Sequence, residues 1–176
     1  LILITGFAAK NVCSCVFEAD RVPESVAAQD NNFDLVHLAD YAVDLETLKA
    51  SATVFGLKKR TAKFNSGLGC TLLPEDADKN ALFEYQPQRN ISENALSYPF
   101  GNGNPIDTTF SEVNYIQLEK ALENAFFDDH KTRAVLVLYK DHMIAERYAA
   151  GFSKETKMLG WSMTKSITSA VLGVLE

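Results

Sequence analysis

Two apolar stretches separated by a short turn constrain the fold most strongly. Residues 134–139 form a continuous apolar run of strand length, and residues 143–148 return after a turn at 140–142. An apolar run of this length that is bounded by turn residues predicts a buried strand. Together the two stretches predict an antiparallel hairpin, with the first strand central in a sheet and the second meeting solvent at Glu146 and Arg147.

Helical patterns flank this hairpin. Residues 111–128 have an apolar stripe at helical spacing, with Ser111 or Asn114 as the N-cap. A second apolar pattern begins near residue 162, after a loop at 149–157. The order helix, strand, strand, loop, helix predicts an α+β fold in which helices pack on an antiparallel sheet. One hairpin does not complete such a sheet, so we expect further strands after residue 176. The stripe of the first helix consists of Ile116, Leu118, Ala121, Leu122, Ala125 and Phe126.

The N-terminal part of the chain reads as an extension of short strands and turns, from residue 11 to about residue 73. A hairpin is favoured where two β-prone runs flank a glycine turn, and Gly and Asn clusters mark the other turns. The predicted elements are a helical turn at 23–29, a strand at 33–38, a hairpin of strands 50–55 and 60–64 around Gly56, and a short strand at 70–73.

Residues 74–112 read as a connecting segment, because they contain four of the five prolines of the chain. The stretch Gly101-Asn-Gly-Asn is glycine-rich, but no strand precedes it and no Gly-Lys-Ser/Thr follows, so we expect a surface loop and not a phosphate site. Asn90-Ile-Ser92 matches the glycosylation pattern, to which we give no weight in the absence of a secretory eukaryotic context. We therefore divide the chain into residues 1–10, 11–110 as extension and linker, and 111–176 as the start of a second domain.

Residues 1–10 are largely apolar and leave two interpretations open. They are either the end of a signal sequence or membrane anchor whose main part precedes residue 1, or a short buried strand or helix. The net charge of −6 argues against nucleic acid or an anionic membrane surface as the main partner.

The chain has three cysteines, at positions 13, 15 and 70. In an oxidising compartment Cys70 would pair with Cys13 or Cys15, since the latter two are too close together to be the natural pair. Three reduced, partly buried thiols are the alternative. The C-x-C spacing with one distant cysteine lacks the pattern of structural zinc sites, so we predict no metal. A bridge would also fit a secreted interaction domain built on residues 1–110.

Ser162 and Lys165 begin the last helical pattern and are the candidate catalytic residues. Positions i and i+3 lie on one face of a helix, so a hydroxyl and an amine would be presented together at its N-terminus. The apolar residues that follow lead us to expect a centrally buried helix. Burial would lower the pKa of Lys165 and make it a base for the Ser162 proton. The alternative is a serine N-cap followed by a solvent-facing lysine.

The sequence around this pair resembles the β-lactamase-related serine hydrolases, which include class C β-lactamases, D,D-peptidases, family VIII esterases and 6-aminohexanoate-dimer hydrolases. The resemblance covers residues 111–176: a hairpin, then Glu146-Arg-Tyr, Gly151-Phe, a loop, and Trp161-Ser-Met-Thr-Lys-Ser followed by the apolar helix. It implies a β-lactamase/transpeptidase-like fold. The turn at Asp141-His142 departs from a glycine-containing hairpin.

The resemblance also implies a mechanism. Ser162 would attack a small-molecule ester or amide to form an acyl-enzyme, with Lys165 as base and the Ser162 N–H as half of an oxyanion hole. No cofactor is implied. The downstream Tyr-x-Asn and Lys-Thr-Gly motifs of such enzymes do not occur in these 176 residues. We therefore expect little turnover from this chain alone, and the alternative is a non-catalytic binding or sensing module that keeps the fold.

The role of Trp161 and the substrate stay open on the sequence. Trp161, beside the nucleophile, either lines the substrate pocket or packs under the loop. Esters, β-lactams, D-amino-acid peptides and short amides are all substrates that the resemblance allows. Residues 9–17 and 67–72 resemble, more loosely, the N-terminal extension of membrane-anchored bacterial members, which implies an extracytoplasmic location and a Cys70 bridge.

Overall fold

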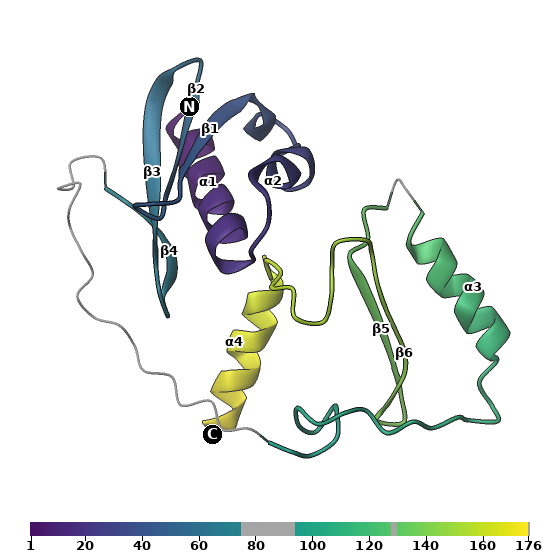
Figure 1. Ribbon diagram of the computed structural model, residues 1–176. Coiled ribbons are helices and arrows are strands. Elements are labelled where there is room, and N and C mark those ends of the chain that lie inside the picture. The colour runs from purple at the N-terminus through teal and green to yellow at the C-terminus, as the bar shows by residue number, and fades with distance from the viewer. Residues whose placement is uncertain (75–93, 128–129, 176) are drawn as a thin grey trace. The chain divides into compact units, whose positions relative to one another are not determined.

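The computed structural model describes residues 1–74, 94–127 and 130–175 (Figure 1). The chain has an α+β fold, as the sequence predicts. It divides into a first unit, Leu1–Pro87 with Lys157–Glu176, and a second unit, Gln88–Thr156. The contacts thus group the chain differently from the predicted division at residues 10 and 110, since the last residues lie with the first unit. We call residues 1–74 the N-terminal body.

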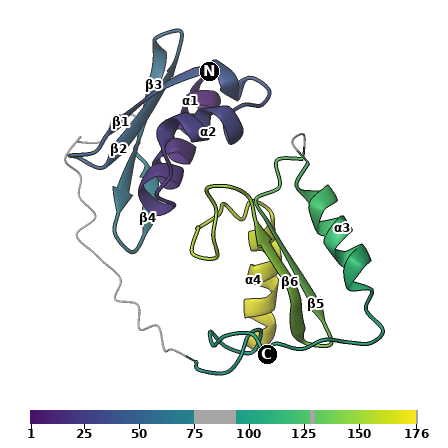
Figure 2. The ribbon, with the colours of Figure 1, turned by 45° about the vertical axis from the view of Figure 1, so that its right-hand side comes forward.

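Helix α1 (Ile2–Cys13), continued by the π-helix η1 (Ser14–Glu18), is the centre of the N-terminal body. It lies along one face of the sheet in Figures 1 and 2. Small residues on its inner face allow this close approach: a Cβ added at Gly6 would lie 3.2 Å from the Leu72 side chain. Residues 2–10 belong to a helix with a buried face. The strands predicted from residue 11 onward begin only after this helix. The sequence did not reveal the helix, because a short run that is apolar on most sides has no periodicity that distinguishes a helix from a strand.

The sheet beneath α1 has four antiparallel strands in the order β1-β2-β3-β4. The strands are β1 (Ala39–Asp44), β2 (Lys49–Val54), β3 (Leu57–Asn65) and β4 (Gly69–Leu72). Alternate residues of β2 are buried, which places Ala50, Ala52 and Val54 on one face. The predicted hairpin is confirmed, although its turn is shorter than expected. Phe55 and Gly56 both have positive φ, and Leu57 already belongs to β3.

Two short helices precede the sheet. Helix α2 (Pro23–Gln29) confirms the helical turn predicted there, with proline in the first turn. The strand predicted at 33–38 is wrong: Asp34 has a φ of +39°, and Val36–Leu38 form a 3-10 helix, η2. A left-handed residue interrupts the extended backbone, so the strand starts only at Ala39.

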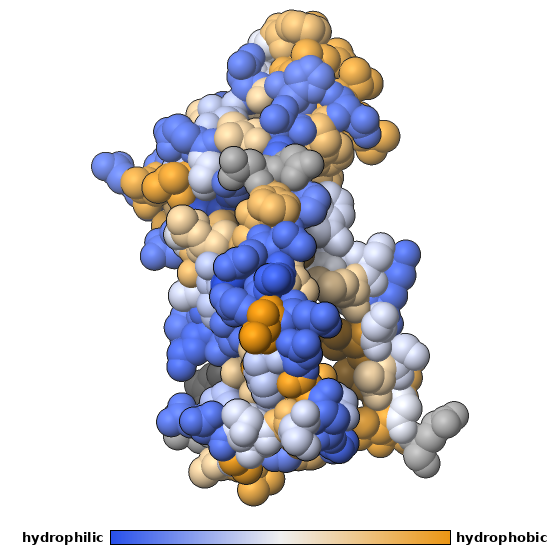
Figure 3. Space-filling view, turned by 90° about the vertical axis from the view of Figure 1, so that its right-hand side faces the viewer, coloured by the Kyte–Doolittle hydropathy of each residue, from blue (hydrophilic) through white to orange (hydrophobic). Residues whose placement is uncertain are grey.

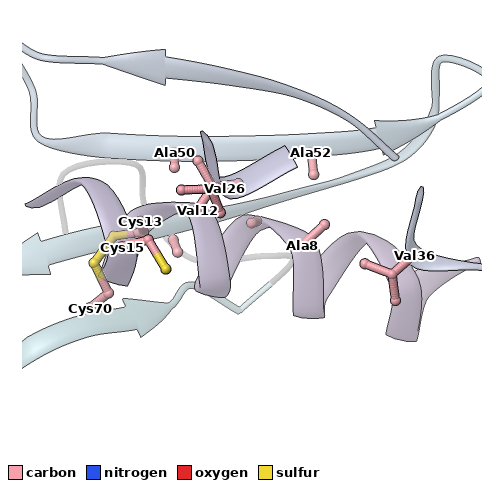
Figure 4. Close-up of a cluster of buried hydrophobic side chains, with 11 residues drawn as sticks. Ala8, Val12, Cys13, Cys15, Val26, Val36, Ala50, Ala52 and Cys70 are labelled. Carbon is pink, nitrogen blue, oxygen red and sulfur yellow. A yellow bond between two sulfur atoms is a disulfide. The ribbon is translucent and has the colours of Figure 1, made fainter. Parts of the chain in front are cut away.

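The core of the N-terminal body is small and is joined by a disulfide (Figure 4). Cys13 of α1 is bonded to Cys70 of β4, which settles the pairing that the sequence left open. Cys15 is buried nearby, with its Sγ 3.9 Å from Nη1 of Arg21. Arg21 also forms a largely buried ion pair with Asp30 at 2.5 Å.

The second unit contains helix α3 (Tyr115–Ala125) and the hairpin of β5 (Ala134–Tyr139) and β6 (His142–Tyr148). Asn114 caps α3 by accepting a hydrogen bond from the Gln117 N–H at 3.1 Å, so the choice of Asn114 over Ser111 is settled. The hairpin turns on Lys140 and Asp141, which both have positive φ.

The predicted central burial of β5 is wrong in this structure. Leu136 and Leu138 are 42% and 49% exposed, because β6 is the one strand paired with β5 among the described residues. Figure 3 likewise shows apolar side chains at the surface between hydrophilic ones on the face that it draws. Residues 94–112 contain no helix or strand, apart from a bridge between Ser97 and Gly103, which agrees with the predicted connecting segment. Asn90-Ile-Ser92 lies outside the described residues.

Candidate active site at the start of helix α4

Ser162 and Lys165 lie at the start of helix α4 (Met163–Val174), drawn in yellow in Figure 1. The first turn is tight. The Gly160 carbonyl accepts from the Met163 N–H at 2.9 Å, and the Ser162 carbonyl accepts from the Lys165 N–H at 3.1 Å. These bonds span three residues, as in a 3-10 turn. Ser162 is therefore the N-cap, and Lys165 lies one turn inside the helix, as predicted.

The Ser162 hydroxyl is not used as a cap. Serine at this position usually accepts a hydrogen bond from the second or third helical N–H. In the part of the chain that the structure describes, the Ser162 side chain makes no such bond, and its own N–H makes no backbone hydrogen bond. Ser162 is exposed, so its hydroxyl is accessible to a ligand.

The predicted burial of α4 is wrong in this structure. Every residue from 161 to 175 is exposed, including Ile167 at 62% and Val171 at 56%. The physical reason is the lack of a partner, since no described element covers either side of α4. Lys165 is therefore exposed too, and not the buried amine that we expected. The described residues also show no hydrogen bond between the Ser162 hydroxyl and the Lys165 amine.

Trp161 packs on the N-terminal body. Its ring stacks on that of Phe7 of α1, with centroids 5.5 Å apart, and lies edge-on to Phe33 at 6.5 Å. The Trp161 side chain nonetheless stays 59% exposed, so it is packed on one side only. Sequence analysis did not find Phe7 and Phe33, because no local pattern links residues so far apart in the chain.

The backbone at Trp161 is left-handed, with a φ of +44°. A residue with a Cβ adopts this conformation at a cost of roughly 1–2 kcal/mol. The turn is further held by the Thr164 hydroxyl, which donates to the Trp161 carbonyl at 2.7 Å. Directly before Ser162 the chain therefore changes direction, at a residue whose ring is stacked and whose carbonyl is hydrogen-bonded.

One groove of the described chain lies apart from Ser162 and Lys165. A groove of about 500 Å³ lies along β1–β3, and neither Ser162 nor Lys165 lines it. No group of three or more His, Cys, Asp or Glu residues is placed to hold a metal ion within the described residues. The groove is lined by Ala42, Val43, Asp44, Lys49, Ser51, Lys59, Arg60, Thr61, Leu73 and Pro74.

Within residues 1–74, 94–127 and 130–175, no helix combines the length and the apolar character needed to cross a bilayer. Comparison with family models, with curated proteins and with solved structures found no match to the chain.

Proposed function

We propose that Ser162 and Lys165 are the nucleophile and base of a serine hydrolase of the β-lactamase-related type, which acts on a small ester or amide. One observation carries the proposal: the Ser162 hydroxyl stands at the N-cap of α4 without capping it, one helical turn before an amine. A serine that served only the helix would be expected to bond to the first-turn N–H groups. The resemblance of residues 111–176 to these enzymes supports the same assignment.

In the proposed reaction, the Ser162 hydroxyl oxygen attacks the substrate carbonyl carbon, and its proton passes to the Lys165 amine. The carbonyl oxygen becomes an oxyanion that accepts a hydrogen bond from the Ser162 N–H, and the positive end of the α4 dipole favours it further. Collapse of this intermediate releases the alcohol or amine and leaves an acyl group on Ser162. Water then attacks the ester, and the acid leaves.

The proposal includes two statements about context. The chain of 176 residues alone turns over little substrate, because a second oxyanion donor and a second acid–base group are not among its motifs. The protein works outside the cytoplasm, which the Cys13–Cys70 disulfide supports, since such bonds persist in oxidising compartments.

A second candidate function is a binding or sensing module without catalysis. The exposure of Lys165 and of the apolar side chains of α4 favours it, since an exposed amine lacks the desolvation that activates a lysine base. The same experiment separates the two functions.

That experiment is covalent labelling with an alkyl fluorophosphonate, followed by peptide mass spectrometry. Ser166 lies on the same helix and is also exposed, so it provides the internal reference. We expect Ser162 to react at least about tenfold faster than Ser166, since general-base assistance accelerates such steps by this much or more. Ser162→Ala should abolish the fast adduct, while Ser166→Ala should leave it. Equal labelling of the two serines would support the non-catalytic module.

Turnover is tested separately with a p-nitrophenyl ester. We expect no hydrolysis by the 176-residue chain above the rate of its Ser162→Ala variant. Hydrolysis that Ser162→Ala removes would contradict the statement that the chain alone is inactive, although it would strengthen the assignment of the nucleophile.

A further inference from the structure

The segment 157–161, which leads to Ser162, contacts the N-terminal body through the side chain of every second residue. Lys157 Nζ lies 2.5 Å from Glu18 Oε1 of η1. Leu159 packs against the buried core cluster that contains Ala8, Val12 and Cys13. Trp161 stacks on Phe7. Side chains that alternate in this way belong to an extended segment with one face against a surface.

Trp161 is the last residue of this segment, and its contact differs from those of Lys157 and Leu159. It is the only tryptophan of the chain, and its ring contacts two aromatic rings of the N-terminal body. Its left-handed backbone turns the chain from this segment into α4. A non-glycine residue keeps such a conformation when its surroundings hold it there. Here the surroundings are the Phe7 and Phe33 rings on one side and the Thr164 hydroxyl on the other.

We infer that Trp161 is a positioning residue: its stacking on Phe7 and Phe33 fixes the turn that presents Ser162 at the N-terminus of α4. The N-terminal body then takes part in building the site and is not an independent appendage. The catalytic meaning of this inference rests on the proposed function, whereas the anchoring of Trp161 does not.

The anchoring is tested on the whole chain through the fluorescence of its single tryptophan. Phe7→Leu removes the stacking ring but keeps an apolar side chain. The matched control is Phe17→Leu, since Phe17 also packs on the core and pairs with Phe64 at 6.0 Å, without contact to Trp161. We expect Phe7→Leu to raise the acrylamide quenching constant of Trp161 by less than about twofold, since its side chain is already 59% exposed, and to shift its emission to the red. Phe17→Leu should change neither, and Phe7→Tyr, which keeps the ring, should restore the wild-type signal.

If Phe7→Leu fails to fold, as judged by circular dichroism, Phe33→Leu tests the second ring of the same contact. Unchanged quenching in the folded variant, or an equal change in Phe17→Leu, would overturn the inference. The positioning role is then read from the fluorophosphonate rate at Ser162 relative to Ser166. We expect this ratio to fall about fivefold in Phe7→Leu and to recover in Phe7→Tyr; an unchanged ratio would refute positioning. Absence of selective labelling in the wild type would contradict the proposed function alone, since quenching still decides the anchoring.

Discussion

The N-terminal body and the rest of the described chain are built in different ways. Every buried apolar residue except Leu122 belongs to the N-terminal body among the residues that the structure describes. Helices α1 and α4 make the contrast sharpest, since both have 12 residues and both are rich in apolar side chains. Seven residues of α1 are buried, and none of α4 are. The difference teaches that an apolar sequence pattern can predict a helix, whereas the burial of that helix depends on the elements that pack against it.

The largest expected effect comes from placing a charge on each of these helices. Val12 of α1 is fully buried, and Val171 of α4 is 56% exposed. Val12→Asp should lower the free energy of unfolding by about 5 kcal/mol, because an uncompensated charge is taken out of water. Val171→Asp should change it by no more than about 0.5 kcal/mol. Urea unfolding followed by circular dichroism measures both, and an equally harmful Val171→Asp would show that α4 is covered in solution.

The same contrast explains which parts of the fold were predictable. The hairpin of β5 and β6 and the cap at Asn114 follow from local signals, namely an apolar run and a side chain suited to bond an N–H. Strand β1 was missed because its exposed side carries Asp40 and Asp44, a residue type that is depleted in strands, although the inward residues alternate as a strand requires. Strand register and the helix that covers the sheet depend on contacts that a local pattern does not contain.

The candidate site was predictable only in part. The spacing of Ser162 and Lys165 and the start of α4 near Ser162 follow from the sequence. The exposure of Lys165 does not, because it depends on the packing around the whole helix. The contact between Phe7 and Trp161 does not either, since it joins the two ends of the chain.

The second expected effect concerns the covalent link of the N-terminal body. The Cys13–Cys70 bond spans a sequence separation of 57 residues. The double change Cys13→Ser and Cys70→Ser should lower the free energy of unfolding by about 4 kcal/mol, because the unfolded chain is no longer constrained. Urea unfolding with and without reductant measures this loss, and reductant should have no effect on the double variant. Peptide mapping that finds Cys70 bonded to Cys15 would contradict the pairing.

A smaller effect is expected in the second unit, where the turn of the β5–β6 hairpin holds two residues in a left-handed backbone conformation. Lys140 and Asp141 have φ values of +46° and +61°, a conformation that glycine adopts at little cost. Asp141→Gly should therefore stabilise the hairpin by about 1 kcal/mol. Hydrogen exchange of the β5 and β6 amides measures the change. Asp107→Gly is the control, since Asp107 is exposed and has no positive φ, and it should give no gain. A loss of protection in Asp141→Gly would refute the strain.

The smallest effect concerns the surface ion pair between Lys140, in the turn of the β5–β6 hairpin, and Glu112, which lies just before α3. Lys140 donates a hydrogen bond to Glu112, which lowers the pKa of Glu112 to about 2. Because the folded pKa lies below the ordinary value, this contribution to stability is present above about pH 4.5 and is lost as the pH falls toward 2. Both side chains are exposed, so the effect is modest and salt weakens it.

Hydrogen exchange of the second unit between pH 5 and 2 tests this dependence, with values corrected for the intrinsic exchange rate. Glu112→Gln should flatten the dependence, whereas Glu123→Gln, a change on the exposed surface of α3, should leave it as in the wild type. An unaltered pH profile in Glu112→Gln would show that the pair adds nothing.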